Sequence, residues 1–224
     1  MNNLFDYNIV YKKRKTIGIE INNNGEILIK APLGTSKDII NNILKDKNKW
    51  INQKLKKIKT RVQLNGNEIM YLGKIYKTSI LVQKYLKREF VLINDNKIII
   101  NVKKRENVKD CLIEHFKKKT YDEIEKRIEV YKGFFPVEPK SIKIREQKTI
   151  WGSCSYDNKL SFNYKLIMAD IKIIDYVVVH EMSHMIHKNH SMNFWKKVEE
   201  ILPDYEMRKK WLNDNGYLLD LQQL

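Results

Sequence analysis

Apolar and polar residues alternate along residues 7–31, a pattern typical of half-buried β-strands. The runs YNIVYKK, TIGIEIN and EILIKAP follow one another, and Asn22 to Gly25 predict a hairpin turn before the third run. Pro32 and Gly34 interrupt this alternation. Residues 35–62 then place apolar side chains at helical spacing, and Ser36 or Thr35 can cap the start. This part of the chain therefore predicts strands followed by one long helix.

Alternation returns over residues 69–102 and predicts further strands. A helical pattern follows from about Asn107 to Tyr131, and Gly133 and Pro136 end it. Two or three strands are expected within residues 141–167, with a turn at residues 156–158. The remaining pattern is helical, at residues 173–188, residues 193–201 and around residues 205–211.

Together these elements predict an α+β fold. We expect a β-rich N-terminal region with one helix, residues 1–105, followed by a second region, residues 106–224. In the second region a small sheet would pack on a buried helix and on further helices. The two regions could also form a single compact unit.

The composition is that of a globular chain, with 42% hydrophobic and 31% charged residues among 224. No apolar run approaches the roughly 20 residues that span a bilayer, so we expect no membrane partner. The N-terminal residues lack the apolar core of a signal peptide, and the two cysteines form no C-x-x-C pair. We therefore expect a cytoplasmic protein.

The net charge of +16 would attract polyanions such as a nucleic acid or a nucleotide. Lysines are spread over nearly every segment, however, which also fits a general compositional bias. The net charge therefore fits either a functional basic surface or a general bias in composition.

Chemistry concentrates in one short stretch near residue 180. Four of the five histidines, His180, His184, His187 and His190, lie here. His180 and His184 are one helical turn apart, so both imidazoles can reach one ion. Glu181 lies about 100° around the helix from His180, where a carboxylate can reach a water molecule on that ion. The flanking residues are uncharged, so this H-E-x-x-H pattern would lie on a mostly buried helix.

A catalytic zinc ion usually has three protein ligands and one open position. His187 lies about 10.5 Å along the helix axis from His180, too far for convergence on one ion. His190 can approach if the helix stops after His184 and the chain folds back, and Asn189 tolerates the left-handed conformation of such a stop. We therefore predict His180, His184 and His190 as ligands of one Zn²⁺. The alternatives are histidines satisfied by ordinary hydrogen bonds, and a purely structural zinc, which would give Glu181 no obvious purpose.

The segments IWGSCSYDNKLSFNYKL and IIDYVVVHEMSHMIHKNHSMNFW resemble the YgjP-like metallopeptidases, a family related to the SprT-like and WLM-type zincins. The motifs APLG, DKNKWINQKL and YLGKIY extend the likeness over most of the chain. The resemblance implies a minimal zincin catalytic domain with the histidine of Asn189-His190-Ser191 as third ligand. Asp170 departs from the proline that is usual before the helix.

The expected activity is zinc-dependent hydrolysis of peptide bonds in a polypeptide substrate. Glu181 would accept a proton from the water on the zinc and deliver it to the leaving amine. Trp151, Gly152 and Ser153 would lie on or beside a strand that aligns substrate, although Trp151 could equally be core and Gly152 a bulge. His187 would face substrate, support a ligand or lie on the surface. Phe194 and Trp195 are expected to pack behind the site.

The sequence offers more than one residue that could stabilise the oxyanion. Tyr205, Arg208 and His187 are the candidates for that role, and each could instead have a structural role.

Two other functions fit the same residues. A metal ion with a carboxylate base can also hydrolyse nucleotide phosphoanhydrides. The basic surface could instead serve a DNA-associated protease or a non-catalytic nucleic-acid-binding protein.

Overall fold

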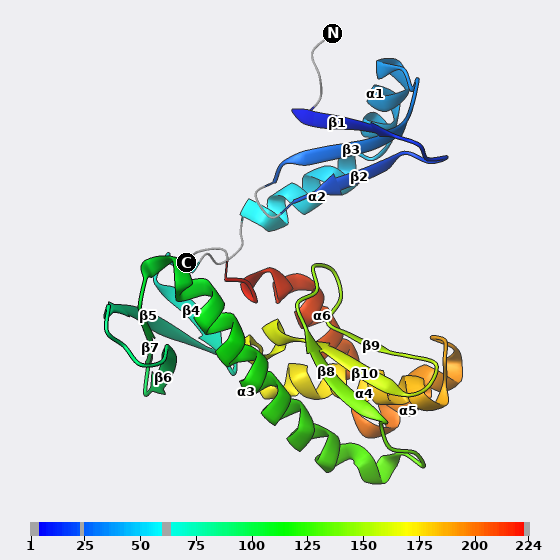
Figure 1. The fold of residues 1–224 in the computed structure, drawn as a ribbon. Helices are drawn as coiled ribbons and strands as arrows, with labels where there is room; N and C mark the ends of the chain where they lie inside the picture. The colour runs from blue at the N-terminus through cyan, green and yellow to red at the C-terminus, as the bar shows by residue number, and fades with distance from the viewer. Residues whose placement is uncertain (1–4, 23–24, 60–63, 222–224) are drawn as a thin grey trace. The chain divides into compact units, whose positions relative to one another are not determined.

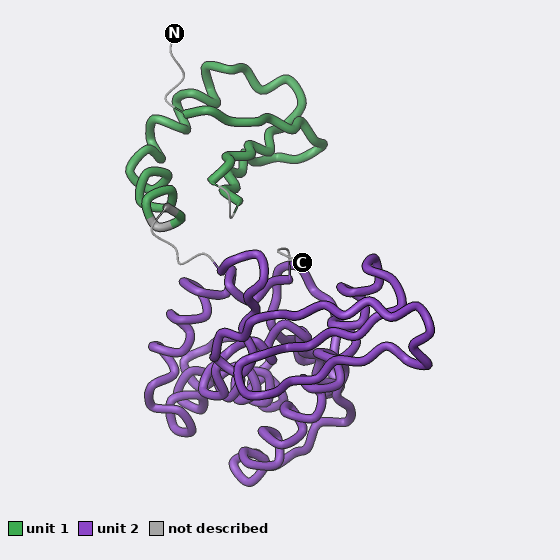
Figure 2. The backbone as a smooth tube through the Cα atoms, turned by 90° about the vertical axis from the view of Figure 1, so that its left-hand side faces the viewer, with its two compact units in different colours: residues 1–63 green, residues 64–224 purple. Residues whose placement is uncertain are grey.

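Strand β3 (Ile27–Pro32) is the middle strand of the first sheet, in the order β1-β3-β2. A computed structural model describes residues 5–22, 25–59 and 64–221, and divides the chain into an N-terminal unit, Met1–Gln63, and a C-terminal unit, Leu64–Leu224 (Figure 2). The other elements of the N-terminal unit are β1 (Tyr7–Lys12), β2 (Gly18–Ile21), α1 (Lys37–Asp46) and α2 (Asn48–Lys59).

The N-terminal sheet is held to its helices by a small apolar core. Strand β3 runs parallel to β1 and antiparallel to β2, so the expected hairpin joins β2 to β3. Residues 23 and 24 of the expected turn lie outside the described residues. Alternate side chains of β3 are buried against the helices. The buried members of this core are Ile27, Ile29, Ala31, Ile40, Leu44 and Ile51.

The single helix predicted for residues 35–62 is wrong in one respect, because it forms two helices. Ser36 caps α1 as predicted, its hydroxyl accepting from the amide of Ile39 at 3.4 Å. Lys47 then leaves the helical conformation, with φ −93° and ψ 5°, and α2 starts at the next residue. The run KDKNK, residues 45–49, offers no apolar side chain to bury, so nothing holds a continuous helix against the sheet there. Residues 60–62 of the predicted helix lie outside the described part.

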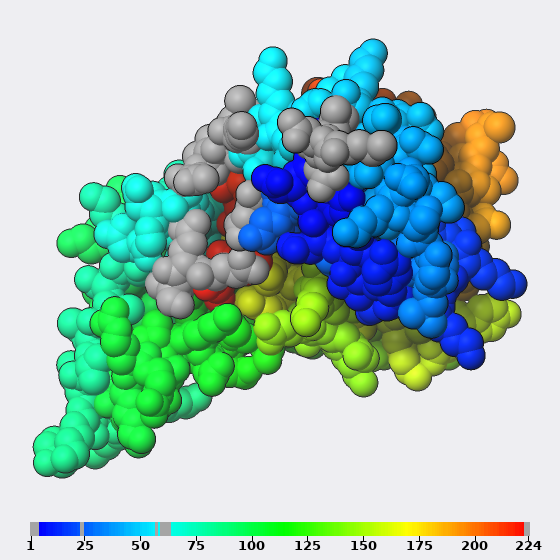
Figure 3. Space-filling view, turned by 90° about the horizontal axis from the view of Figure 1, so that it is seen from above, coloured from blue at the N-terminus to red at the C-terminus, as the bar shows by residue number. Residues whose placement is uncertain are grey.

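Two sheets flank the long helix α3 (Val108–Tyr131) in the C-terminal unit (Figure 1). The first has the order β4-β5-β7-β6, with β5 parallel to β7 and the outer pairs antiparallel. Its strands are β4 (Glu68–Tyr71), β5 (Lys74–Val82), β6 (Phe90–Asn94) and β7 (Lys97–Val102). In Figure 3 the teal-green atoms of this sheet project from the rest of the unit.

The second sheet has the order β8-β10-β9, with β10 parallel to β8 and antiparallel to β9. Strand β9 (Gly152–Cys154) lies at its edge and, within the described residues, pairs with β10 alone. The remaining strands and α-helices of the unit are β8 (Ser141–Arg145), β10 (Lys159–Asn163), α4 (Ile171–Ile186), α5 (Met192–Ile201) and α6 (Tyr205–Asn215). Its 3₁₀ helices are η1 (Arg105–Asn107), η2 (Lys132–Phe134), η3 (Tyr164–Met168) and η4 (Gly216–Leu218).

Contacts in the structure place the division between units well before the boundary near residue 105 that the sequence suggested. The turn between β4 and β5 is bound to η3, because the amides of Leu72 and Gly73 donate to the carbonyls of Ile167 and Met168 at 2.8 and 3.2 Å. Gly73 has φ +77°, and a Cβ there would lie 2.9 Å from the Cα of Asp170. This first sheet therefore supports the start of α4 and shares one core with the second sheet.

The architecture is α+β, as the sequence predicted, and its largest core lies around α3 and α4. Helix α4 is buried along most of its length, including Val177, Val178, Val179 and Met182. Asp175, buried on the same helix, binds the guanidinium of Arg127 on α3, with Oδ1 and Nε 2.5 Å apart. Across the described ranges, no helix combines the length and the apolar character needed to cross a membrane.

Candidate metal centre

Helix α4 carries the H-E-x-x-H motif and begins at a side-chain cap. The carboxylate of Asp170 accepts a hydrogen bond from the amide of Lys172 at 2.8 Å, as an N-cap aspartate does. The capped, buried helix then runs to Ile186 and includes His180, Glu181 and His184. Asp170, which stands where proline is usual, thus caps the helix with its side chain.

The end of α4 turns the chain back toward the motif. His187 takes an extended conformation, φ −116° and ψ 100°, while its amide still donates to the carbonyl of Ser183 at 2.9 Å. The helix thus continues two residues beyond His184, where the sequence argument had ended it. Positive φ outside glycine occurs in the described chain at Leu72, Asp95 and Asn158, and not at Asn189. The reversal therefore uses extended backbone at His187 and not the left-handed residue expected at Asn189.

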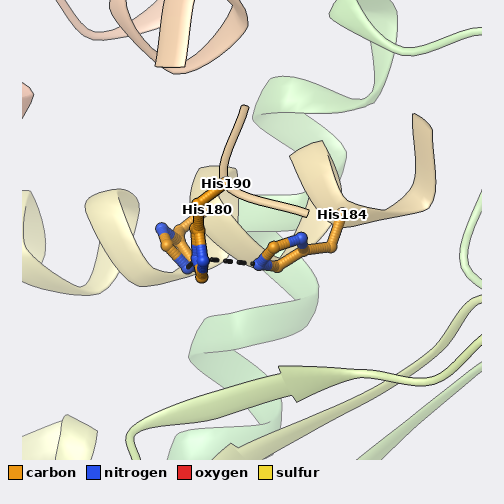
Figure 4. Close-up of side chains that lie close together, drawn as sticks. All are labelled: His180, His184 and His190. Atoms are coloured by element: carbon orange, nitrogen blue, oxygen red, sulfur yellow. Dashed lines mark hydrogen bonds between the residues drawn. The ribbon is translucent and has the colours of Figure 1, made fainter. Parts of the chain in front are cut away.

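This reversal brings three imidazoles together. The Nε2 atom of His190 lies 3.1 Å from Nε2 of His180 and 3.2 Å from Nε2 of His184 (Figure 4). These three residues are the group in the described chain whose ligand atoms could share one metal ion, all within 4.8 Å of one another. Cys154, on the edge strand, is not part of that group. The three side chains that the sequence singled out as ligands are therefore adjacent.

A divalent cation fits this donor set. Tetrahedral zinc with Zn–N bonds of about 2.0–2.1 Å requires ligand nitrogens roughly 3.3 Å apart, close to the separations observed. Three imidazole nitrogens this close repel one another through their lone pairs unless a cation or protons lie between them. In addition, Nδ1 of His180 is buried and has no hydrogen-bond partner among the described residues. An ion on the three Nε2 atoms would remove the repulsion between their lone pairs, while this Nδ1 would stay without a partner.

The protonation states of the histidines favour metal binding. Burial lowers the pKa of His180 to about 3, with further contributions from His184, His190 and Lys209. Burial also lowers the pKa of His184. The Nδ1 atom of His184 lies 3.0 Å from the carbonyl oxygen of His187, which can only accept a hydrogen bond. Nδ1 therefore carries the proton, and Nε2 presents its lone pair to the cluster.

Glu181, the residue after His180 on α4, has a buried carboxyl group. Its residue is 5% exposed, and burial raises its pKa to about 8. No described residue forms an ion pair with it. Gly152 on β9 approaches it, since a Cβ there would lie 2.7 Å from both Cγ and Oε1 of Glu181. The edge strand thus approaches the carboxyl group so closely that only glycine fits.

The other residues of the β9 segment contribute packing and position. Trp151 is half-buried against the C-terminal segment, because a Cβ on Gly216 would lie 2.8 Å from its Cζ2. Its carbonyl accepts from the amide of Asn163 at 2.9 Å, which holds the start of β9 to β10. Ser153 is half-buried and pairs with Ser161 across the sheet.

Aromatic rings from α5 and α6 back the three histidines. Phe194 is fully buried, with its centroid 4.9, 4.4 and 4.9 Å from those of His180, His184 and His190. Trp195 lies beside His190 and stacks on Tyr205, with centroids 5.4 Å apart and planes at 20°. Lys209 places its Nζ 4.0 Å from the centroid of Trp195. Lys209 was not among the residues expected from the sequence, although its i, i+4 spacing from Tyr205 places both on one face of α6.

Two predicted side chains have other partners. Arg208 places Nε 2.8 Å from Oδ1 of Asp204, and its Nη1 donates to the carbonyl of Lys172 at 3.0 Å. It also lies 3.8 Å from the buried carboxylate of Asp175. His187 contributes its carbonyl to His184, while its own side chain is half-buried.

The sequence matches the model of a known protein family. Residues 15–215 match the sequence model described as YgjP-like, metallopeptidase domain. The match extends over both units. A solved structure, the metallopeptidase zymogen of Pyrococcus abyssi abylysin, aligns with 18% identity and a TM-score of 0.38, over 42% of this chain and 95% of that one. No curated protein matches the chain in sequence.

Proposed function

Because the chain belongs to the YgjP-like metallopeptidase family, we propose that it is a zinc-dependent peptidase whose single ion is held by His180, His184 and His190. The observation that carries the proposal is the convergence of the three Nε2 atoms at 3.1 and 3.2 Å beside the buried carboxyl group of Glu181. Three neutral imidazoles are a donor set that favours zinc among the common divalent ions.

A zinc ion held there would supply Lewis-acid chemistry, lowering the pKa of a water molecule and polarising the substrate carbonyl. Glu181 is placed to handle the proton in this reaction. It follows His180 directly on α4, and its burial makes the carboxylate a stronger base than an exposed glutamate. In the proposed mechanism a carboxylate oxygen of Glu181 takes the proton from the attacking water. The same oxygen then gives it to the departing amine.

Strand β9 is the proposed platform for the polypeptide substrate. It is the edge of its sheet, so one side of its backbone is available for pairing with an extended peptide. The close approach of Gly152 to Glu181 sets this edge beside the base. An extended substrate hydrogen-bonded along Gly152 and Ser153 would therefore pass the carboxylate. The backbone of β9 would bind substrate in this arrangement, and Trp151 would anchor the strand.

We assign oxyanion stabilisation to Tyr205 in preference to Arg208. The guanidinium of Arg208 already binds Asp204, Asp175 and the carbonyl of Lys172. The ring of Tyr205 stacks on Trp195, which in turn lies beside His190, so Tyr205 is on the same side of the cluster as that ligand. The side chain of His187 is the alternative donor, since among the described residues it is the carbonyl of His187, and not its imidazole, that binds His184.

The metal requirement of this proposal is tested by chelation. The protein is treated with a chelator, dialysed, and assayed on an unfolded protein substrate before and after addition of one equivalent of Zn²⁺. The proposal expects cleavage to disappear on chelation and to return with zinc. Cleavage that persists in metal-free protein would contradict it.

A further inference from the structure

The four-stranded sheet has a second face that the core does not use. Leu81 and Phe90 both pair with Asn101, one from each neighbouring strand, so their side chains share a face. Leu92 lies on that face as well, opposite Ile99. Leu81, Phe90 and Leu92 are 44%, 40% and 45% exposed. Apolar side chains thus line a solvent-facing sheet surface, away from the core around α3.

A shallow hollow of about 610 Å³ adjoins this face, in the loop between β5 and β6. It is lined by residues 83–88 and by Phe90. Three of the lining residues are cations, Lys84, Lys87 and Arg88, and none is acidic. The hollow is therefore a positively charged depression beside an apolar sheet face.

The one acidic residue of this loop is directed elsewhere. The carboxylate of Glu89 accepts hydrogen bonds from the amide of Lys103 at 2.8 Å and from Nδ2 of Asn107 at 2.7 Å. Its negative charge therefore lies near the start of α3. The three cations of the hollow are not neutralised by their neighbour in sequence.

Tyr85 projects from the same loop with 90% of its surface exposed. Among the described residues, the contact found for this ring is with Lys84, whose Nζ lies 5.8 Å from the ring centroid. The ring therefore has no evident packing role. Exposed aromatic rings that alternate with cations suit a ligand with both flat π faces and negative charges. Lys77 and Lys97, paired across β5 and β7 on the same sheet face, continue the positive charge along it.

Single-stranded nucleic acid has this chemistry. Its unstacked bases can lie on Tyr85 and Phe90, while its phosphates contact the lysines and the arginine. A duplex hides its base faces, and an acidic peptide offers carboxylates without flat rings. We propose that the hollow at residues 83–90 and the adjoining sheet face bind single-stranded DNA, as a site separate from the histidine cluster.

The experiment uses the full chain and a fluorescently labelled single-stranded DNA of about 20 nucleotides, and measures binding by anisotropy at several salt concentrations. We expect Tyr85→Ala to weaken binding about tenfold, since one stacked base is lost. The matched control is Tyr156→Ala, because Tyr156 is also 90% exposed and also carries a lysine, Lys188, over its ring. That control should bind as the wild type does.

The charge contribution is tested separately. Replacing Lys84, Lys87 and Arg88 together by glutamine should reduce the slope of log K against log salt by about two, at roughly 0.7 per phosphate contact. The control replaces three exposed lysines of the same unit, Lys118, Lys140 and Lys143, by glutamine. It removes the same charge and should leave the slope nearly unchanged.

Three results would overturn the proposal. The first is equal weakening by the two triple variants, which would mean that only the net charge matters. The second is wild-type affinity in Tyr85→Ala. The third is equal or tighter binding of a blunt duplex, polyglutamate or anionic vesicles, each of which would identify a different partner.

Discussion

The indole ring of Trp195 stacks on the imidazole of His190, with centroids 5.5 Å apart and planes at 19°. His190 comes from the loop after α4, is exposed and follows a chain reversal, whereas His180 and His184 are fixed by their helix. No hydrogen bond from backbone to its ring is found among the described residues. Apart from the other two imidazoles, Trp195 and Phe194 are therefore the rings that hold the third imidazole in place.

This stacking predicts that Trp195 controls metal affinity without touching the metal. Trp195→Leu should weaken zinc binding about tenfold to a hundredfold, the range seen when a supporting partner of a ligand is removed. Trp195→Phe keeps a flat ring and should recover most of the affinity. Competition with a chromogenic zinc chelator measures both. Equal affinities for Trp195→Leu and the wild type would show that the stack does not position His190.

The contact between β9 and Glu181 predicts a specific sensitivity at Gly152. The Cβ of Gly152→Ala would lie 2.7 Å from Glu181, so either the carboxyl group or the edge strand must move. We expect peptidase turnover to fall about a hundredfold, because a displacement near 1 Å can have that effect, while zinc is still bound. Gly133→Ala is the control, since an added Cβ there meets nothing within 4 Å. Full activity in Gly152→Ala would refute the close approach.

The choice of third ligand predicts opposite results for two neighbouring histidines. His190→Ala should lose more zinc affinity than the about tenfold to hundredfold change of a supporting residue. His187→Ala should retain near-wild-type affinity, since its carbonyl, which binds His184, remains. Zinc content after dialysis against a weak chelator distinguishes them. Greater loss in His187→Ala would reverse the assignment.

Burial of Glu181 predicts a pH-dependent stability of the metal-free protein. Its pKa is about 8 in the folded protein against 4.5 as the ordinary value, so the folded state holds the proton more tightly. That contribution to stability is fully present below pH 4.5 and is lost as the pH rises toward 8, at about 1.4 kcal/mol per pKa unit and several kcal/mol at most. Glu181→Gln has no such titration.

Metal-free Glu181→Gln should therefore gain in unfolding temperature over metal-free wild type as the pH increases from about 5 to about 8. Both proteins share His180 and His184, so the histidine titrations largely cancel in the comparison. Thermal unfolding followed by circular dichroism gives the difference at each pH. A difference that does not change with pH would mean that the carboxyl group is not effectively buried.

Much of the fold followed from local patterns in the sequence. Alternation predicted the strands, and the long apolar stripes predicted α3 and α4, because these signals depend on residues near one another in the chain. The break at Lys47 was missed, since the helical stripe continues beyond it. The division between units was also placed too late, because the hydrogen bonds from Leu72 and Gly73 to η3 join segments far apart in sequence.

The three histidines of the candidate site could also be predicted from local spacing, but their supporting contacts could not. The i, i+4 spacing places His180 and His184 together, and the distance argument against His187 leaves His190, which the structure brings to them. The contact of Gly152 with Glu181 and the stack of Trp195 on His190 depend on how β9 and α5 pack on α4. Such contacts leave no periodic signal in a single sequence. The roles of these residues in metal binding and catalysis stay predictions.

The most direct test of peptidase function is the appearance of new amino termini in a mixture of unfolded proteins. Zinc-loaded wild type is compared with zinc-loaded Glu181→Gln and with Glu199→Gln, which changes an exposed glutamate of α5. We expect new termini with wild type and with Glu199→Gln, and none with Glu181→Gln. Absence of new termini with the zinc-loaded wild type, or equal cleavage by Glu181→Gln, would contradict the account.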